Sequence, residues 1–520
     1  MTADAALFQA GADALAANDL TGASRSFGQI VAGNPRAHAA WNALSVIAVR
    51  SGAPDVAVEH SRRALEFNRR NAVYLNNLAV AYGELGQLAE CEAALRRALK
   101  AKPAYTEGLY NLAKVLFKQG RLEESSRCYE RAHAIDPNFP ELRRNIAITY
   151  HALGRANLGV PVLRAAERAN ADDEQVPSIL AGCLLDSEGA DAAIAYLHRV
   201  VEQHPDWRDA HMALALIQLA LGQWRAGWRE YYWRPNIPLA QRARNLPDQL
   251  PKRLERTRVL LKHEQGLGDI LFFLRFAPEL ARRGAKLVVS CPEKLVGILS
   301  GVDALSEITA SPEGDDGLDL RIWMGDLPLL LEGSGTPPPL RLKIDGNRTR
   351  RWAERLAQLG PAPYLGLTWR AGTNWLAAPE FGRSRALISK AIPPDSLGAA
   401  VRDWPGTLFS LQRAPDAADL AKAAHAANAP VHDLSALNDD LADMLAVLSL
   451  LDDYVTVSNT NVHLLAGLGK TAKVLVPFPP EWRWMHSGEA SPWFPGFRVY
   501  REQPGQGWSD ALAAMRAALA

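Results

Sequence analysis

Cysteine is scarce in this sequence of 520 residues, which contains only four. They are Cys91, Cys128, Cys183 and Cys291. Each stands alone in a regular apolar pattern, without the CxxC or Cys/His spacing that a zinc ion requires. We therefore interpret the cysteines as small buried side chains and expect no metal site.

Long apolar runs and an excess of charge are also absent. No stretch of about 18 apolar residues, the length of a membrane span, occurs anywhere. The N-terminus, MTADAALFQAGADALAAND, lacks the basic start and apolar segment of a signal peptide, so we expect a cytoplasmic protein without an integral membrane segment. The 58 Lys and Arg residues nearly balance 57 Asp and Glu, which gives no reason to expect a nucleic-acid partner. The length predicts two or three domains.

A period of 34 residues marks the first half of the chain. Four prolines are separated by 34 residues or by twice 34, namely Pro35, Pro103, Pro137 and Pro205. This is the length of a tetratricopeptide unit. The segments LNNLAVAYGELGQ (75–87) and LYNLAKVLFKQGR (109–121) carry leucine, alanine and glycine at the same offsets. About seven units fit over roughly residues 3 to 236, and they predict an α-solenoid over residues 1–236, followed by a linker at 237–257.

Three asparagines lie 34 residues apart in successive units of this array. They are Asn77, Asn111 and Asn145, and they occupy one position of the first helix of each unit, on the expected concave face. A carboxamide both donates and accepts hydrogen bonds, so a ladder of them can bind a peptide backbone whatever its sequence. Local packing between repeats is the alternative explanation. The hypothesis that follows is a groove for a protein partner.

From residue 258 the pattern changes to alternating strands and helices. Strands are predicted within RVLLK (258–262), AKLVVSCP (285–292), YLGLTWRAG (364–372), GTLFSLQ (406–412), DYVTVSNT (453–460) and AKVLVPF (472–478). Strand and helix in turn imply parallel sheets, here in two halves at 258–345 and 346–505, with a closing helix at 506–520. The predicted fold class is α plus α/β. Ligands of such sheets bind outside the carboxyl ends of the strands.

The first motif at such a strand end is HEQGLGDILFF (263–273). Gly266 and Gly268 allow a close approach of the backbone to a ligand, and Asp269 stands at the start of the following helix. Leu271 occupies the third glycine position of the dinucleotide fingerprint, so no dinucleotide cofactor is expected. A simple helix-capping role for Asp269 is the alternative.

The second motif, TWRAGTNW…RSRAL, follows the strand predicted at 364–372. It contains Trp369, Arg370 and Arg383. Arginines at this place can neutralise a diphosphate through charge-assisted hydrogen bonds, although they can equally be surface charges.

The third motif, VSNTNVHLLAGLGK (457–470), is a strand end followed by a helix. The exposed amides of Asn459, Thr460 and Asn461 at the helix start form an anion site that suits a phosphate. An ordinary asparagine or threonine cap is the alternative. His463 lies inside the helix and is interpreted as a packed residue.

Together these motifs resemble a known arrangement. The runs HEQGLGDILFFLRFAPEL, LTWRAG…RS and LLDDYVTVSNTNVHLLAGLGKTAKVLVPFPPEWRW are similar to the glycosyltransferase module found behind tetratricopeptide repeats in many bacterial proteins. That module is heptosyltransferase-like and O-GlcNAc-transferase-like, of the two-Rossmann type called GT-B, and the layout is also similar to that of flagellin-modifying transferases. The resemblance covers about residues 258 to 505.

The resemblance implies metal-independent transfer of a sugar from a nucleotide donor, with inversion and without a cofactor. It implies Asp269 as the base, and a diphosphate held by the 459–461 helix start with Arg370 or Arg383. The donor contacts predicted with them are Gly266, Gly268, Trp369 and His463. The implied acceptor is a protein, with Ser or Thr hydroxyls presented by the repeats. Relatives commonly carry Asp-Thr where this chain has Asn459-Thr460, a departure that bears on donor choice and on activity. The alternatives are a non-catalytic scaffold and transfer to lipopolysaccharide sugars.

Overall fold

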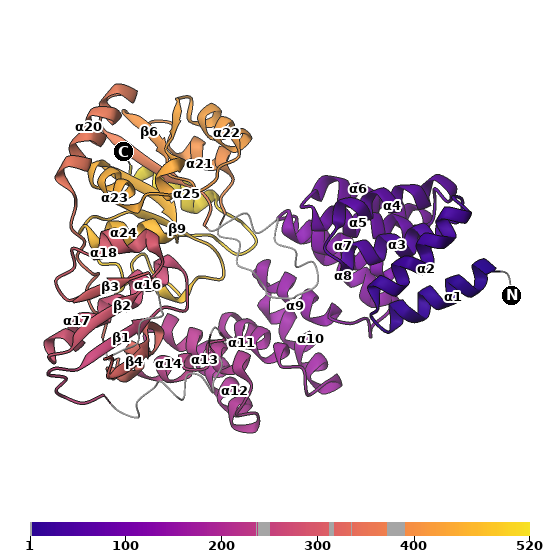
Figure 1. The fold of residues 1–520 in the computed structure, drawn as a ribbon, viewed down its shortest axis with the longest axis horizontal. Helices are drawn as coiled ribbons and strands as arrows, with labels where there is room; N and C mark the ends of the chain where they lie inside the picture. The colour runs from indigo at the N-terminus through magenta and orange to yellow at the C-terminus, as the bar shows by residue number, and fades with distance from the viewer. Residues whose placement is uncertain are drawn as a thin grey trace. The chain divides into compact units, whose positions relative to one another are not determined.

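The computed structural model describes residues 3–235, 237, 250–310, 317–333, 335–371 and 391–519. The chain divides into two compact units, of which the first comprises residues 1–183 and the second residues 184–373 with 388–520. Each unit is described by itself below. The division falls within the helix α11 (Gln175–Ser187), and the element labels are those of Figure 1.

The first unit consists of antiparallel helix pairs, as the 34-residue period predicts. Its helices are α1 (Ala3–Ala16), α2 (Leu20–Gly33), α3 (His38–Arg50), α4 (Pro54–Phe67), α5 (Ala72–Glu84), α6 (Leu88–Ala101), α7 (Thr106–Lys118), α8 (Leu122–Ile135), α9 (Leu142–Ala152) and α10 (Ala156–Ala169). The small residues Ala98 and Ala132, on α6 and α8, are fully buried, which allows the paired helices to approach closely. Each pair also packs on the next, so the apolar faces are covered along the array.

The turn inside most pairs depends on a glycine, whereas the turn between α1 and α2 has Asn18 with φ of +59°. Gly52, Gly86, Gly120 and Gly154 follow one another at 34-residue intervals and have φ angles of +74°, +71°, +75° and +72°. Only glycine adopts this left-handed conformation without strain, and it ends the first helix of the pair. In the next repeat the corresponding residue is Gly189, one position beyond the 34-residue period, with φ of +98°. The backbone conformation therefore repeats with the same 34-residue period as the sequence from Gly52 to Gly154.

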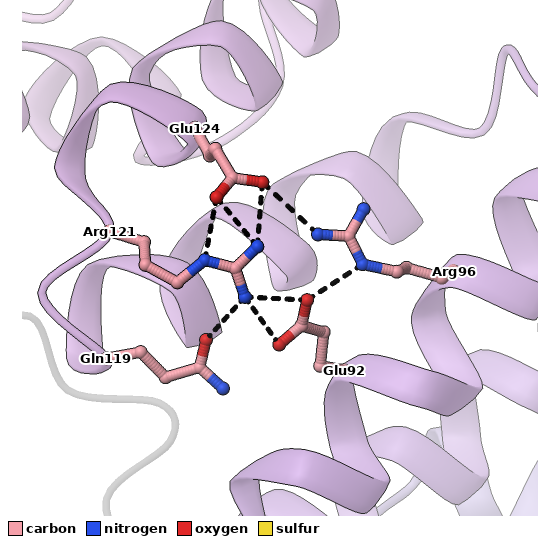
Figure 2. Close-up of polar contacts among 5 residues, drawn as sticks. All are labelled: Glu92, Arg96, Gln119, Arg121 and Glu124. Atoms are coloured by element: carbon pink, nitrogen blue, oxygen red, sulfur yellow. Dashed lines mark hydrogen bonds and ion pairs between the residues drawn. The ribbon is translucent and has the colours of Figure 1, made fainter.

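Successive repeats are also joined by a network of charges near their surface, shown in Figure 2. Arg121 donates to both oxygens of Glu92 at 2.8 Å and to both oxygens of Glu124 at 2.7 Å. Arg96 donates to Glu92 at 2.8 Å and to Glu124 at 3.3 Å, and Gln119 accepts from Arg121 at 3.1 Å. We call Glu92, Arg96, Arg121 and Glu124 the repeat quartet. It links α6 to the start of α8.

The second unit begins with α12 (Ala190–Gln203), α13 (Arg208–Ala220) and α14 (Trp224–Tyr231). Its strands are β1 (Arg258–Lys262), β2 (Lys286–Ser290), β3 (Glu307–Thr309), β4 (Leu320–Trp323), β5 (Tyr364–Thr368), β6 (Thr407–Ser410), β7 (Val431–Asp433), β8 (Asp453–Val457), β9 (Lys473–Val476) and β10 (Arg498–Arg501). The six strands predicted from the sequence are confirmed. Its further helices are α16 (Leu267–Phe273), η1 (Leu274–Phe276), α17 (Ala277–Arg282), α18 (Glu293–Leu299), η2 (Met324–Asp326), α19 (Leu327–Leu330), α20 (Gly346–Leu359), α21 (Pro394–Ala400), α22 (Ala417–Ala427), η4 (Ser435–Asn438), α23 (Leu441–Leu450), α24 (Thr460–Gly467), η5 (Trp482–Trp484) and α25 (Ser509–Ala517).

All the strand pairs described in the second unit are parallel, in two sheets. The first sheet has the order β3-β2-β1-β4 and the second the order β10-β9-β8-β5-β6-β7. The second order is that of a doubly wound nucleotide-binding sheet, in which the direction of winding reverses between β5 and β8. In the first sheet the reversal lies between β1 and β4. These two switch points are where such sheets bind ligands.

The cores explain how the two sheets are held. Leu365 and Leu367 of β5 pack with α21 and α25 on one face of the second sheet, in a core of its own. The other face shares one continuous core with the first sheet, with α16 and α24 in contact. The C-terminal helix α25 lies against α21 and β10 of the second sheet. The two halves are therefore packed through α16, α18, α23 and α24.

The last repeat belongs to the same core. Trp228 of α14 is buried, and its ring lies 5.4 Å from that of Trp482 and 6.2 Å from that of Phe273, centroid to centroid. The amide of His486 donates to the carbonyl of Ala220, at the end of α13. The repeat boundary predicted at 236 therefore does not coincide with a division between compact units.

Candidate functional site

The turns after β1 and β8 meet in the second unit. A Cβ built on Gly268 would lie 3.2 Å from Cδ2 and 3.3 Å from Nε2 of the His463 ring, and 3.7 Å from the Cα of Thr460. A side chain at position 268 would require the His463 ring to move by a few tenths of an ångström, so the starts of α16 and α24 lie close together. The stretch HEQGLGD and the stretch SNTNVH, which are almost 200 residues apart in sequence, form one place in the structure.

Asp269 stands at this place and is engaged by an arginine from another segment. Its Oδ1 accepts from Nη2 of Arg483, which lies in η5, and 29% of the Asp269 side chain is exposed. The second amino group of Arg483 donates to Glu481 at 2.5 Å, and the other oxygen of Glu481 accepts from Ser458 at 3.0 Å. Asp269 does not cap α16, since no side-chain cap is formed there. The alternative explanation of Asp269 as a helix cap is therefore wrong.

The environment of Arg483 keeps it charged. Its guanidinium lies 4.7 Å from the ring centre of Phe272 and 4.6 Å from that of Trp482. Burial favours the neutral form, but the carboxylates of Asp269 and Glu481 outweigh it and raise the pKa of Arg483 above its ordinary value. Arg483 is thus a fixed cation between two acids.

The start of α24 is held mainly by its own side chains. Asn459 is the N-cap and accepts from the amide of Val462 at 3.4 Å, while its own amide donates to Thr456 at 2.9 Å. The Asn461 side chain is buried and donates to the hydroxyl of Tyr454 at 3.1 Å. The capping alternative is therefore confirmed for Asn459, and Asn461 reaches a ligand only through its backbone. Thr460, the first residue of the helix, is half-buried.

The second motif is only partly described. Trp369 is 2% exposed and packs into the core of the second sheet, so the prediction that its side chain contacts a donor is wrong because the ring has no open face. Arg370 donates its backbone amide to Gln412 at 2.8 Å and its guanidinium to the carbonyl of Ala414 at 3.0 Å. No carboxylate of the described residues pairs with Arg370, which leaves its charge available near the switch point of this sheet. Arg383 lies outside the described residues.

The switch point of the first sheet is occupied by the chain itself. Arg234, which follows α14, is 1% exposed and donates to Glu264 at 2.9 Å and to Asp326 at 2.5 Å. Glu264 follows β1 and Asp326 follows β4, so we call Arg234, Glu264 and Asp326 the buried triad of the switch point. A Cβ at Gly325 would lie 2.5 Å from Glu264, so only glycine fits beside the triad. Tyr231 of α14 pairs with Gln265 next to it, at 3.1 Å.

Burial dominates the acids of this triad. Desolvation raises the pKa of Glu264 even though Arg234 opposes the change. The same burial penalises the charge on Arg234, and the two carboxylates outweigh it and raise the pKa of its guanidinium. One cation shared by two buried acids fixes the turn that leads to Asp269.

The asparagine ladder is present, with its amide groups already engaged. Asn77 donates to Asn42 at 2.8 Å, Asn111 to Asn76 at 2.9 Å, and Asn145 to the hydroxyl of Tyr110 at 2.9 Å. Each bond runs to the preceding repeat, as the packing alternative predicts. The three side chains are half-buried, and their carboxamide oxygens accept no hydrogen bond among the described residues. The peptide-groove hypothesis stays a prediction.

Sequence reasoning missed Arg483, Glu481 and the triad. Arg483 lies in PPEWRW, which was quoted only as part of the resemblance, and Arg234 lies in WREYYWRP, the aromatic-rich end of the repeats. Glu264 lies inside HEQGLGD itself. For the arginines the available signal was a tryptophan next to the charge, because a charge among buried aromatic residues is costly unless it is paired. For Glu264 it was the position directly after a strand.

None of the helices in the part of the chain that the structure describes combines the length and the apolar character that a membrane crossing needs. Within the same residues, His, Cys, Asp and Glu side chains do not gather in threes as they would around a metal ion.

Comparison with known protein families matches the repeats. Models described as tetratricopeptide repeat match residues 8–72, 184–226 and 72–105, and a model described as TPR repeat matches residues 114–154. The match at 184–226 falls in the second compact unit, which agrees with α12 to α14 being repeat helices.

One curated relative spans most of the chain, and solved structures resemble only part of it. Protein FlbA of Caulobacter vibrioides is 22% identical over 525 aligned positions, which cover 88% of this chain and 85% of the relative. A tetratricopeptide repeat protein from Parabacteroides merdae is 17% identical, with a TM-score of 0.37, over 44% of this chain and 91% of its own. YrrB, titled a TPR protein with an unusual peptide-binding site, is 20% identical, with a TM-score of 0.29, over 36% of this chain and 98% of its own. The repeat models and the two parallel sheets together make the chain a tetratricopeptide solenoid joined to an α/β part.

Proposed function

We propose that this protein is a nucleotide-sugar-dependent, inverting, metal-independent glycosyltransferase of the GT-B type. Its acceptor is a Ser or Thr hydroxyl of a protein bound by the repeats, with flagellin as the candidate that the layout favours. The observation that carries the proposal is the contact of Gly268 with Thr460 and His463. This contact brings a partly exposed carboxylate, Asp269, beside a helix start at the carboxyl end of a doubly wound sheet.

The two switch points support a division of labour between the sheets. At the switch point of the first sheet the strand ends are bonded to the chain's own arginine, in the buried triad. At the second, the start of α24 and the cationic Arg370 offer groups that bind a diphosphate. The donor is therefore assigned to the second sheet, and the first sheet supplies Asp269.

The proposed reaction is a single displacement. The carboxylate of Asp269 takes the proton of the acceptor hydroxyl while the hydroxyl oxygen bonds to the anomeric carbon of the donor. The bond between that carbon and the diphosphate oxygen breaks, and its electron pair leaves with the nucleoside diphosphate. The α24 start and Arg370 stabilise the charge that develops there. Attack opposite to the leaving group inverts the anomeric carbon.

Nucleotide release with a panel of nucleotide sugars tests this function. We expect the full chain to release nucleotide with one donor class, and the variant Asp269→Asn to lose at least about 100-fold in rate, as expected for a general base. Asp303→Asn is the matched control, because Asp303 is an exposed acid of the same half, paired with Lys343. Equal rates in wild type and Asp269→Asn would refute the base.

A non-catalytic scaffold is the second candidate. Asn459 supports it, because this position lacks the carboxylate that relatives of the resembled module commonly carry. The readout that separates the two candidates is turnover in wild type. A chain that binds a protein partner and releases no nucleotide with any donor or acceptor, including lipopolysaccharide sugars, is a scaffold.

A further inference from the structure

We infer that Arg483 is the positioning residue of Asp269, through which the second half of the α/β module sets the orientation of the proposed base. The inference rests on the proposed function. It concerns a residue to which neither the repeat pattern nor the resemblance gives a role.

The hydrogen bonds of Asp269 are divided between its two oxygens. Oδ1 accepts from Arg483, whereas Oδ2 accepts no hydrogen bond in the described part of the chain and lies beside Gly266, whose Cβ, if present, would be 3.5 Å away. One oxygen is therefore anchored and the other remains for a proton. A carboxylate held at one oxygen has a fixed direction for the second, which is what a base needs in order to meet a hydroxyl.

Arg483 is itself held from the side of the donor sheet. Its guanidinium bonds Glu481, and Glu481 accepts from Ser458, the residue directly after β8. Ser458 is followed by Asn459, the cap of α24. The chain of contacts from Asp269 to Ser458 thus runs from the first half to the strand end beside the proposed diphosphate site. The base is oriented only while the two halves are packed together.

The planar fork of arginine is required for this arrangement. Two of its amino groups reach two different carboxylates, while its face lies on the rings of Phe272 and Trp482. A lysine has one compact ammonium group and does not span both acids in this geometry. The Nε of Arg483 is buried and has no partner among the described residues. The hydrogen bonds of the Arg483 side chain therefore go to Asp269 and Glu481.

Arg275 provides a control within the same cluster. It is 3% exposed, and its guanidinium lies 4.7 Å from the ring centre of the same Phe272. It donates to the carbonyl of Trp493 at 2.7 Å and has no contact with Asp269. Burial, together with the charge of Arg483, lowers the pKa of Arg275 to about 9. Removing its charge perturbs the aromatic packing and leaves the orientation of the base unchanged.

Steady-state kinetics of the full chain test the inference. We expect Arg483→Gln to lower kcat about 100-fold, the cost of misplacing a reacting group by about 1 Å, with the KM for the donor nearly unchanged. Arg483→Lys restores only part of kcat, and Arg275→Gln lowers kcat no more than a few fold, in line with a loss of packing alone. Equal losses of kcat in Arg483→Gln and Arg275→Gln, or a loss confined to the KM for the donor, would overturn the inference.

A thermal-stability cycle supplies the second measurement and needs no substrate. The shifts in Tm of Asp269→Asn and Arg483→Gln are expected to be non-additive, because each variant removes the same contact. The shifts of Asp269→Asn and Arg275→Gln are expected to add. Additivity in the first pair overturns the inference even when the enzyme is active. Absence of nucleotide release in wild type overturns the proposed function instead, so the two failures are distinguished.

Discussion

The repeat quartet and the buried triad are built from the same kinds of side chain, and they do different things. In the quartet, Arg121 is 38% exposed and each arginine is shared by two acids at the surface of the solenoid. In the triad, Arg234 is shared by two acids as well, but in the core of the second unit. Exposed pairs add little to stability, because water solvates the separated charges almost as well. Buried ions are costly to hold and still more costly to separate.

The difference teaches where specificity lies in this chain. The quartet fastens one repeat to the next and can be replaced by other polar contacts. The triad instead fixes the last repeat to the turns of Glu264 and Asp326. Burial of ions in this place costs stability that an apolar core would not cost, which is expected where an arrangement has to be unique.

Breaking the triad is expected to have the largest effect. Arg234→Met leaves Glu264 and Asp326 buried without their cation, and we expect the free energy of unfolding to fall by about 3–5 kcal/mol. The measurement is urea unfolding of the full chain, followed by the fluorescence of the tryptophans around Trp228.

The control is the triple variant with Glu264→Leu and Asp326→Leu added, which removes the charges as well as their partner. It should recover most of the lost stability, since an apolar replacement of a buried ion group is often neutral or stabilising. A loss below about 1 kcal/mol in Arg234→Met would show that the triad is not a buried ion group of this kind.

The pH dependence of the two networks should have opposite signs. Burial raises the pKa of Glu264 above its ordinary 4.5, so its contribution to stability is greatest below that pH and declines as the pH rises through the raised value. Burial also acts on Glu92, but the hydrogen bonds from Arg96 and Arg121 outweigh it and lower the pKa, so its contribution is complete above 4.5 and is lost as the pH falls through the lowered value.

The measurement is the difference in the free energy of unfolding between wild type and Glu264→Gln, or between wild type and Glu92→Gln, as a function of pH. As the pH rises above 4.5, the difference between wild type and Glu264→Gln should shrink. As the pH rises toward 4.5 from below, the difference between wild type and Glu92→Gln should grow. Two curves of the same sign would mean that Glu264 is solvated like Glu92.

The smallest effect is expected at the quartet. Glu92→Gln should lower the free energy of unfolding by about 1 kcal/mol or less, and the loss should disappear as salt is raised from about 0.1 to about 1 M, because the screening length falls from about 10 to about 3 Å. Arg234→Met, measured in the same two buffers, should be unaffected by salt. If Glu92→Gln still lowered the free energy of unfolding at about 1 M salt, the quartet would be a buried ion network like the triad.

The sequence predicts the repeats and the strands well, for physical reasons. A 34-residue period and a short apolar run bounded by turns depend on neighbours along the chain, and both Gly86 with its left-handed turn and the strand at 258–262 were readable from them. The meeting of Gly268 with His463 was expected only through the resemblance.

What the sequence could not predict depends on contacts between distant segments. Arg483 reaches Asp269 across 214 positions, and Arg234 reaches Asp326 across 92. The neighbouring aromatic residues were the local signal that set these arginines apart from surface charges, and that signal does not name the partner. Trp369 shows the opposite error, since tryptophan beside arginine looked like a ligand contact and proved to be core.

The glycine turns of the solenoid and the burial of Trp228 in the core of the second unit together determine where repeats can be added or removed. Copies of a unit ending in a turn like that of Gly86 or Gly120 can be gained or lost within the first unit while the residues of α13 and α14 that pack with the sheets stay the same. The same exchange at α13 and α14 would remove Trp228 from the core that α14 shares with the sheets and would displace Arg234, which pairs with Glu264. Relatives of this chain should therefore vary in repeat number at one end only, and engineered versions with longer arrays should be extended there.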